Sequence, residues 1–386
     1  TGASTYSPQV QNRISVDGKI ISTELSPLTL QILSDNLVEI RQNATLLAAK
    51  IEVISENGLY NGSLLSYFAQ GNGAPLPAIS LFARTLAIAG SLKSGSQNRA
   101  GSIKIEGQDS LNIENAQIIA NGNDGGNVEI VSMNGTVSLI NSVVQTNGGE
   151  GRGGAISVAG LQSTILSGST LEATGINQGG KILIGNDAKN GTLPFSIYTS
   201  LDKVTLVSAA QQTSNLSNQN GGFIETSSKG AVALAPQAQI NTSANNRTGK
   251  AGTWLLDPID LTIDSTAANV ISAVLANNNV IIEVNANTTA CPIGSCTQNG
   301  TGSLSIASGA DILKAGANYT TLTLSSTGIF NLNANISGQN LDVIISSSIA
   351  YLNVGTSITA SKVTVQAQTI YAAGNINTSR YSLTGN

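Results

Sequence analysis

The chain has 386 residues, of which 40% are hydrophobic, 10% charged and 4% aromatic, with a formal net charge of −4 and no histidine. The apolar content is too high for a disordered segment, and 18 thinly spread Lys and Arg argue against nucleic acid as a partner. No apolar run approaches the length of a membrane-spanning helix, and without histidine no Ser-His catalytic triad can be assembled.

The first part of the chain, residues 1–90, predicts β-rich coils of low regularity. Residues 28–54 are rich in strand-forming residues with alternating apolar positions, which indicates short strands. Residues 60–78 contain Pro75 and Pro77 and are interpreted as an irregular loop.

Residues 91–256 carry an internal repeat in which a glycine is followed by a strand that alternates polar and apolar residues. Two further short strands follow within each interval, so one interval predicts one three-sided coil of a parallel β-helix. The 42-residue interval is interpreted as a normal coil with an extra loop or hairpin around residues 186–217. The glycines are Gly101, Gly126, Gly154, Gly180, Gly222 and Gly252, at intervals of 25, 28, 26, 42 and 30 residues.

Residues 257–300 are interpreted as a linker that holds a short helix over 265–276. Ser265 is the expected N-cap, and the apolar residues 270, 271, 274 and 275 form one helical face that packs on the solenoid. Cys291 and Cys296 follow closely, and with no other Cys and no His they cannot complete a zinc site. A disulfide in a short surface loop is favoured over two free thiols.

Residues 301–386 repeat at about 19 to 22 residues, which predicts tighter coils with shorter corners. The whole pattern favours an all-β fold, a right-handed parallel β-helix with a short helical excursion. The period is too long for a left-handed hexapeptide helix, and the tight antiparallel turns expected of a sandwich or propeller are sparse.

One segment resembles a known family. Gly252, Trp254, Leu255, Leu256, Asp257, Pro258 and Asp260 lie in the stretch 252–263, which precedes the helix and the apolar strand at 279–284. This arrangement resembles the large exoproteins of two-partner secretion, the filamentous-haemagglutinin-like and high-molecular-weight adhesins of Gram-negative bacteria.

The resemblance implies a secreted or cell-surface protein that an outer-membrane transporter exports and that needs no cofactor. From about residue 91 onward, the coils before this segment resemble the haemagglutination-activity region of such proteins, and those after it resemble their shaft. The secretion domain of that family carries Asn-Pro-Asn motifs, and this sequence contains no Asn-Pro. The chain is therefore interpreted as a downstream portion or a processed product, and the final coil, which lacks a polar cap, as a fragment end or a stacking surface.

Asp257, Asp260 and Asp264 are the strongest candidates for chemistry, because some β-helix enzymes gather carboxylates on one outer face. Strand alternation places Asp260 and Asp264 on one side and Asp257 on the other, and Asp257-Pro258 is typical of a turn. A structural turn is favoured, with a cation site or catalysis as the alternatives.

Two asparagine-rich features have similar double interpretations. The stretch 121–127 faintly resembles a calcium-binding repeat, although a plain asparagine-rich corner is favoured. Asn-X-Ser/Thr sequons, for example at Asn43 and Asn318, leave N-glycosylation open beside the interpretation that stacked asparagines form ladders between coils.

The expected function is that of an adhesin shaft or structural module in cell attachment or aggregation, without enzymatic activity. Its expected partners are a receptor or glycan on a host or sister cell. Two alternatives remain: end-to-end self-association into an extracellular filament, and a β-helix polysaccharide lyase or hydrolase that would need clustered carboxylates on one exposed face.

Overall fold

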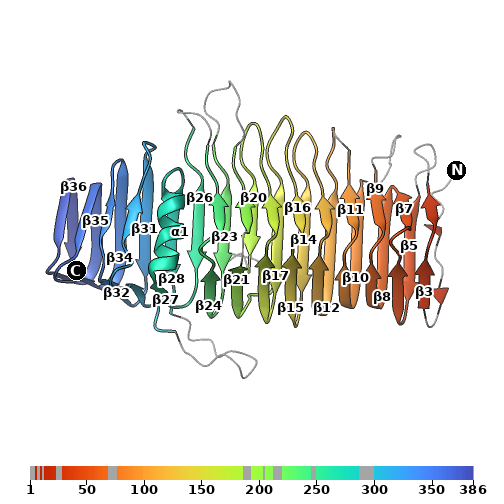
Figure 1. The fold of residues 1–386 in the computed structure, drawn as a ribbon, viewed down its shortest axis with the longest axis horizontal. Helices are drawn as coiled ribbons and strands as arrows, with labels where there is room; N and C mark the ends of the chain where they lie inside the picture. The colour runs from red at the N-terminus through yellow and green to blue at the C-terminus, as the bar shows by residue number, and fades with distance from the viewer. Residues whose placement is uncertain are drawn as a thin grey trace.

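The structure is a computed structural model that describes residues 5–6, 9–10, 13–22, 28–67, 76–96, 98–185, 193–202, 205–211, 220–244, 249–286 and 300–385. The chain forms a rod of stacked coils, with the N-terminal coils at one end and the C-terminal coils at the other (Figure 1). Strands of successive coils pair in parallel, as in the alignment of Ile103 with Val128 and of Val128 with Ile156. The predicted all-β parallel β-helix with one helical excursion is therefore confirmed.

Each coil contributes to three walls, which we name in chain order within a coil. The first wall is continuous along the rod. Its strands are β1 (Thr5–Tyr6), β2 (Gln9–Val10), β5 (Thr29–Ser34), β8 (Lys50–Tyr60), β10 (Ala78–Ile88), β12 (Ser102–Glu114), β14 (Asn127–Ser132), β17 (Ala155–Gly160), β20 (Lys181–Ile184), β23 (Phe223–Ser227), β26 (Thr253–Asp257), β28 (Asn279–Val284), β31 (Thr320–Ser326), β34 (Leu341–Leu352), β35 (Ser357–Ala372) and β36 (Asn375–Gly385).

The longer of these strands continue around a corner into a neighbouring wall. The other strands of the second wall are β3 (Arg13–Val16), β6 (Leu37–Ile40), β15 (Thr136–Ile140), β18 (Ser163–Ser167), β21 (Tyr198–Asp202), β24 (Ala231–Leu234), β27 (Leu261–Ile263), β29 (Leu304–Ile306) and β32 (Ile329–Leu332). Those of the third wall are β4 (Lys19–Ile21), β7 (Thr45–Ala48), β9 (Ser63–Ser66), β11 (Ser91–Ser94), β13 (Gln117–Ile119), β16 (Val143–Gln145), β19 (Thr170–Glu172), β22 (Leu206–Ser208), β25 (Gln239–Asn241), β30 (Ile312–Lys314) and β33 (Ile336–Gly338).

The strand register repeats the intervals of the glycine pattern. Each of the six glycines lies directly before a strand of the first wall, and the strands that follow pair residue for residue. The coils become shorter from β31 onward, where Leu322 pairs with Val343 and Val343 with Val363. The two preceding steps are longer, since Trp254 pairs with Val280 and Val280 with Leu322. The tighter coils therefore lie within residues 301–386, where the sequence predicts them.

The interior of the rod is one continuous apolar core made of the inward side chains of all three walls. In the first wall the inward column contains Trp254, between Ile224 and Val280. Trp254 is fully buried, and its Nε1 donates to Thr226 Oγ1 at 3.2 Å. Because inward apolar residues alternate with outward polar ones, the burial of apolar side chains stabilises every coil of the rod.

The helix α1 (Ser265–Leu275) replaces the third-wall strand of its coil. It contacts β25 of the preceding coil and β30 of the following one, and its apolar face, which includes Ile271 and Leu275, belongs to the rod core. Asp264, not Ser265, is the N-cap: its Oδ1 accepts the N–H of Ala267 at 2.8 Å. The expected N-cap was wrong because Ser265 is itself the first residue of the helix.

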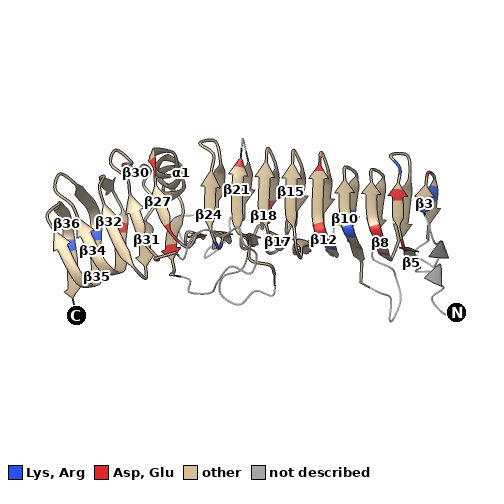
Figure 2. Cartoon of the chain, turned by 90° about the horizontal axis from the view of Figure 1, so that it is seen from below, with Lys and Arg blue, Asp and Glu red and all other residues tan. Residues whose placement is uncertain are grey.

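Within the residues that the structure describes, the first wall alone has strand pairing between this coil and both of its neighbouring coils. The second wall has a break between β24 and β27, and α1 contacts both strands (Figure 2). The helix is therefore an integral part of the wall and core, beyond the surface excursion that the sequence indicated.

The region 60–78 is more regular than expected. Ser63–Ser66 forms β9, which pairs with β7 on one side and β11 on the other, so the loop interpretation of this part was wrong. The sequence Ser-Leu-Leu-Ser is short and does not alternate polar and apolar residues, so it does not identify a strand without its partners. The N-terminal coils also stack in register, with Thr29 opposite Lys50 and Val38 opposite Gly58.

The 42-residue interval is a normal coil, but its extra residues do not form one insertion. β21 and β22 both lie inside the range 186–217 and pair with the strands of the preceding coil. Residues 186–192, 203–204 and 212–219 lie outside the described residues. The additional length is thus divided between separate corners of the coil.

Candidate functional site

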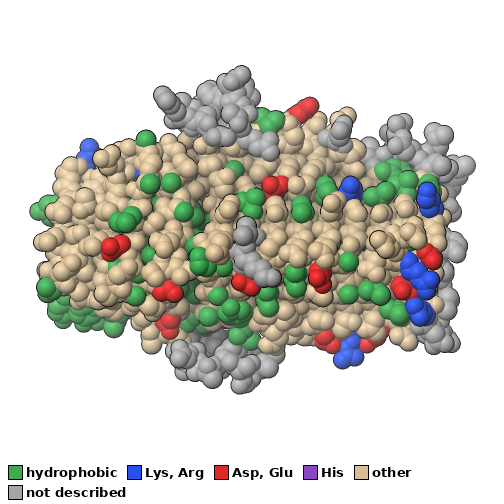
Figure 3. All heavy atoms as spheres, in the orientation of Figure 1, with side chains coloured by type: hydrophobic (Ala, Val, Ile, Leu, Met, Phe, Trp, Pro, Cys, Tyr) green, Lys and Arg blue, Asp and Glu red, His purple; other side chains and the backbone are tan. Residues whose placement is uncertain are grey.

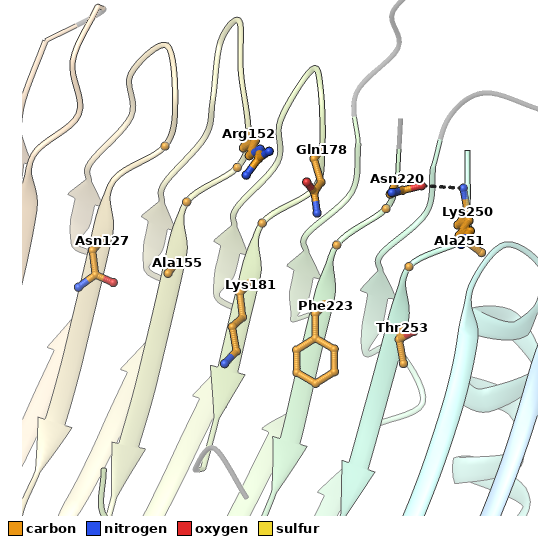
Figure 4. A pocket seen from close by; sticks show the side chains of 18 of the residues that line it. Asn127, Arg152, Ala155, Gln178, Lys181, Asn220, Phe223, Lys250, Ala251 and Thr253 are labelled. Carbon is orange, nitrogen blue, oxygen red and sulfur yellow. Dashed lines mark hydrogen bonds between the residues drawn. The ribbon is translucent and has the colours of Figure 1, made fainter. Parts of the chain in front are cut away.

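A shallow, open groove of about 1010 Å³ runs along one corner of the rod, across five successive coils (Figure 4). Its floor consists of residue pairs that each lie just before a first-wall strand. Because strands of adjacent coils are about 4.8 Å apart, the pairs form a ladder parallel to the rod axis. The pairs are Gly125–Gly126, Gly153–Gly154, Gly179–Gly180, Gly221–Gly222 and Ala251–Gly252.

Steric contact with the neighbouring backbone explains the glycines. A Cβ at Gly154 would lie 2.1 Å from Gly126 O, and one at Gly153 would lie 2.0 Å from Ala173 O. Main-chain atoms cannot move aside as flexible side chains can, so no other residue fits these positions without displacing a coil. Of the predicted coil glycines, all except Gly101 are thus brought together in one flat floor, in which the methyl group of Ala251 is the one side chain.

The backbone of the floor is already hydrogen-bonded within the rod. Gly153 N–H donates to Gln178 O at 2.9 Å, and Gly154 N–H donates to Thr146 O at 2.7 Å. The carbonyl of Gly154 accepts the N–H of Lys181 at 3.0 Å. A ligand in the groove would consequently be recognised through shape and flanking side chains, and would find no unpaired strand edge there.

Two rows of side chains flank the floor. The upper row stands before the glycine pairs and holds Arg152, Gln178, Asn220 and Lys250 (Figure 4). The lower row follows the pairs and holds Asn127, Ala155, Lys181, Phe223 and Thr253. Parallel bridges join the first three residues of the upper row, and Lys250 N–H donates to Asn220 Oδ1 at 3.1 Å. The lower row follows the strand register.

The charges of the groove differ from those of the chain as a whole. Arg152, Lys181 and Lys250 line it and are exposed, whereas no Asp or Glu is among its lining residues. The chain as a whole is acidic, and charged side chains are sparse on the face in Figure 3. Asp124, which occupies the position before Gly125, accepts the backbone N–H of Arg152 at 2.8 Å at the upstream end. The groove is therefore a positively charged strip on an acidic rod.

This groove was not predicted from the sequence. The unequal intervals hide the fact that Arg152, Gln178, Asn220 and Lys250 form one row. The available signal was positional: each of these residues stands two places before the glycine that precedes a first-wall strand. Alignment of the coils on that glycine would have placed the polar residues in register.

The three aspartates do not form a cluster. Asp257 is buried at the end of β26, before the bend at Pro258, and its backbone carbonyl accepts the N–H of Ser228 at 3.1 Å. Asp260 holds the following coil, since its Oδ1 accepts the N–H of Ser303 at 2.7 Å and its Oδ2 that of Thr301 at 3.1 Å. Asp264 caps α1. The carboxylates of Asp260 and Asp264 thus have separate structural roles.

The family-motif residues lie at the junction that contains α1. Gly252 ends the glycine ladder, Trp254 and Leu256 point into the core, and Leu255 is buried on the outer side of β26. The motif therefore marks the coil in which α1 replaces the third-wall strand. The predicted Cys291–Cys296 disulfide lies outside the described residues.

The asparagine-rich corner at 121–127 forms a ladder between coils. Asn121 Oδ1 accepts the N–H of Asn147 at 2.7 Å, and Asn147 Oδ1 accepts the N–H of Thr174 at 2.9 Å. Within the described part of the chain, no three His, Cys, Asp or Glu side chains gather in a way that could hold a metal ion. The corner is explained by these hydrogen bonds.

No protein-family model, no curated protein and no solved structure matches this chain. The resemblance to two-partner secretion exoproteins therefore remains a proposal based on the motif. Among the described residues, no helix is long and apolar enough to span a membrane.

Proposed function

We propose that this chain is a shaft and adhesion module of a secreted bacterial cell-surface protein. The observation that carries the proposal is the uninterrupted first wall, in which every coil from β5 to β36 stacks on the next. Such a solenoid gains its stability from neighbour contacts, so it extends in one direction and offers long corners and walls to other molecules.

The surface of the rod supports an extracellular role. It is built largely from Ser, Thr, Asn and Gly rather than from charged residues, and only 10% of the chain is charged (Figure 3). Backbone hydrogen bonds between coils leave few accessible edges for proteases along the rod. The Gly252–Ile263 motif further supports export by an outer-membrane transporter of the two-partner type.

Two measurements test this function. Antibodies against the purified chain should label intact cells of the source organism, and protease treatment of intact cells should remove the label. Beads coated with the chain should adhere to host or sister cells more than beads coated with heat-denatured chain. Absence of surface labelling together with equal adhesion of both bead types would contradict the proposal.

A second candidate function, end-to-end assembly into a filament, is supported by β36. Tyr381 and Leu383 continue the inward columns of Val363 and Val365 but are 71% and 44% exposed. The β36 face could receive a further coil, either from residues that follow in a longer chain or from a second copy. Sedimentation coefficients that rise with concentration, and that stay constant in Tyr381→Lys, would favour a filament over a monomeric shaft.

The polysaccharide lyase or hydrolase alternative is tested by chemistry alone. Incubation of the chain with pectin-like polymers should release neither reducing ends nor unsaturated sugars. Release of either product would replace the non-catalytic proposal with an enzymatic one.

A further inference from the structure

We infer that the groove binds an acidic polysaccharide whose chain lies along the rod axis. The inference rests on the adhesion function proposed above and names the ligand class of the groove. Three properties carry it: an extended floor built almost entirely of glycine, cationic side chains on both rims, and one aromatic ring within the lower row (Figure 4).

The shape of the groove selects an extended and flat ligand. The floor crosses five coils and is open to solvent along its length. Coils repeat at about 4.8 Å, which is roughly the advance of one pyranose ring in an extended glycan. Successive rings could therefore meet equivalent positions of successive coils, with the flat glycine floor beneath them.

The flanking side chains match the chemistry of a charged glycan. Arg152 and Lys181 lie in adjacent coils, and Lys250 lies two coils further along, so the positive charges are distributed along the axis. Guanidinium and ammonium groups form charge-assisted hydrogen bonds with carboxylates or sulfates. The amides of Gln178 and Asn220 stand between them and can bind sugar hydroxyls.

Phe223 lies between Lys181 and Thr253 in the lower row. Its ring is partly exposed and lines the groove, so it offers an apolar face to the C–H groups of a pyranose ring. An aromatic contact of this kind adds affinity that does not depend on the ligand's charge.

Two other polymers fit less well. A peptide strand binds by adding to an unpaired sheet edge, and the backbone of this floor already forms hydrogen bonds between coils. A single-stranded nucleic acid needs several stacking platforms and a denser cationic track than three charges with one aromatic ring. The acidic polysaccharide is the polymer that the groove favours.

The test measures binding of the purified chain to oligosaccharides of equal length by titration calorimetry. Polygalacturonate and hyaluronan oligomers are the acidic probes, and cello-oligosaccharides are the neutral probe. Binding of an acidic probe should weaken with salt and should fall about tenfold in each of Arg152→Gln, Lys181→Gln and Lys250→Gln. Phe223→Thr should weaken binding without reducing its salt dependence.

Lys362→Gln is the matched control, because it removes an equal charge from an exposed position in β35, away from the groove. It should leave the affinity unchanged, and unfolding midpoints should show that all variants fold. The triple variant combines Arg152→Gln, Lys181→Gln and Lys250→Gln and should lose binding of the acidic probes. The inference would be overturned if the triple variant still bound them or if the native chain bound neither of them. Equal affinity for the neutral probe, or a preference for single-stranded DNA, would also overturn it.

Bead adhesion separates this inference from the proposed function. If the triple variant loses oligosaccharide binding but its beads still adhere to cells, adhesion stands and uses another surface. If the native chain binds acidic oligosaccharides but its beads do not adhere, the groove assignment stands and the adhesion function fails.

Discussion

The side-chain Oδ1 of Asn278 accepts the backbone N–H of Thr242 at 2.8 Å. In earlier coils the equivalent N–H donates to a backbone carbonyl of the next coil, as Ala173 does to Ser208 and Ala209 does to Asn241. The coil after β25 has α1 in place of a third-wall strand, so that carbonyl is missing. Asn278 supplies a side-chain carbonyl at the same place and ends the sheet without a buried unpaired donor.

Replacement of Asn278 should therefore destabilise the rod at the helix junction. Asn278→Ala leaves the buried N–H and Oγ1 of Thr242 without their acceptor, and we expect a loss of about 1–3 kcal/mol in the free energy of unfolding. Asn277→Ala, at the exposed neighbouring position, should cost less than about 0.5 kcal/mol. Denaturant unfolding of both variants measures the difference, and equal losses would contradict the capping role.

The glycine floor should be intolerant of any side chain. In Gly154→Ala the new Cβ would meet Gly126 O at 2.1 Å, so we expect a loss of about 1–3 kcal/mol in unfolding free energy. Gly149→Ala is the control from the neighbouring corner, because its nearest contact would be an ordinary 3.6 Å to Gly122 O. Thermal unfolding should show a lower midpoint for the first variant alone; a matching drop in the control would remove the steric explanation.

The coils marked by glycines could be predicted from the sequence, whereas the regular stacking of the N-terminal coils could not. Gly126 and Gly154 mark their coils because a local steric demand fixes the residue type. The coil at β8 begins after Ala49 instead, so its regular pairing with β5 carried no such signal. Short strands without a distinctive corner residue are recognised only through their partners, which sequence periodicity does not supply.

The groove and the position of the helix in the third wall could not be predicted, because both depend on contacts between residues far apart in the sequence. The helix at 265–276 was predictable from its apolar face, but its place inside the third wall depends on contacts with β25 and β30. Likewise, Arg152 and Lys250 share a row only after the extra residues of the 42- and 30-residue intervals between them are left out. Strand periodicity does not encode insertion lengths at corners, so the row becomes visible only when the coils are aligned on their glycines.

Trp254 should act as both a stabilising residue and a reporter of the junction. It is the only tryptophan and is fully buried, so its fluorescence should be blue-shifted, resistant to acrylamide quenching, and red-shifted on unfolding. Trp254→Ala should lose about 3–5 kcal/mol in unfolding free energy, measured by far-ultraviolet circular dichroism. Trp254→Phe keeps most of the volume and should lose less; equal losses in both variants would show that the indole's bulk is not what the core requires.

The ion pairs of the N-terminal coils should make stability depend on acid pH. Hydrogen bonds from Arg13 and Ser15, together with Arg41, lower the pKa of Glu39 from 4.5 to about 2. A carboxylate with a lowered folded-state pKa stabilises the fold above its unfolded pKa, and that contribution disappears as the pH falls from about 4.5 to about 2. Glu39→Gln should thus lower the thermal midpoint at pH 6, with a gap to the native chain that closes towards pH ~2. Glu114→Gln, which removes an exposed carboxylate at the end of β12, is the control for charge alone. Because solvent screens the Glu39 pair, the shift should be small, and a gap that stays constant across this pH range would refute the assignment.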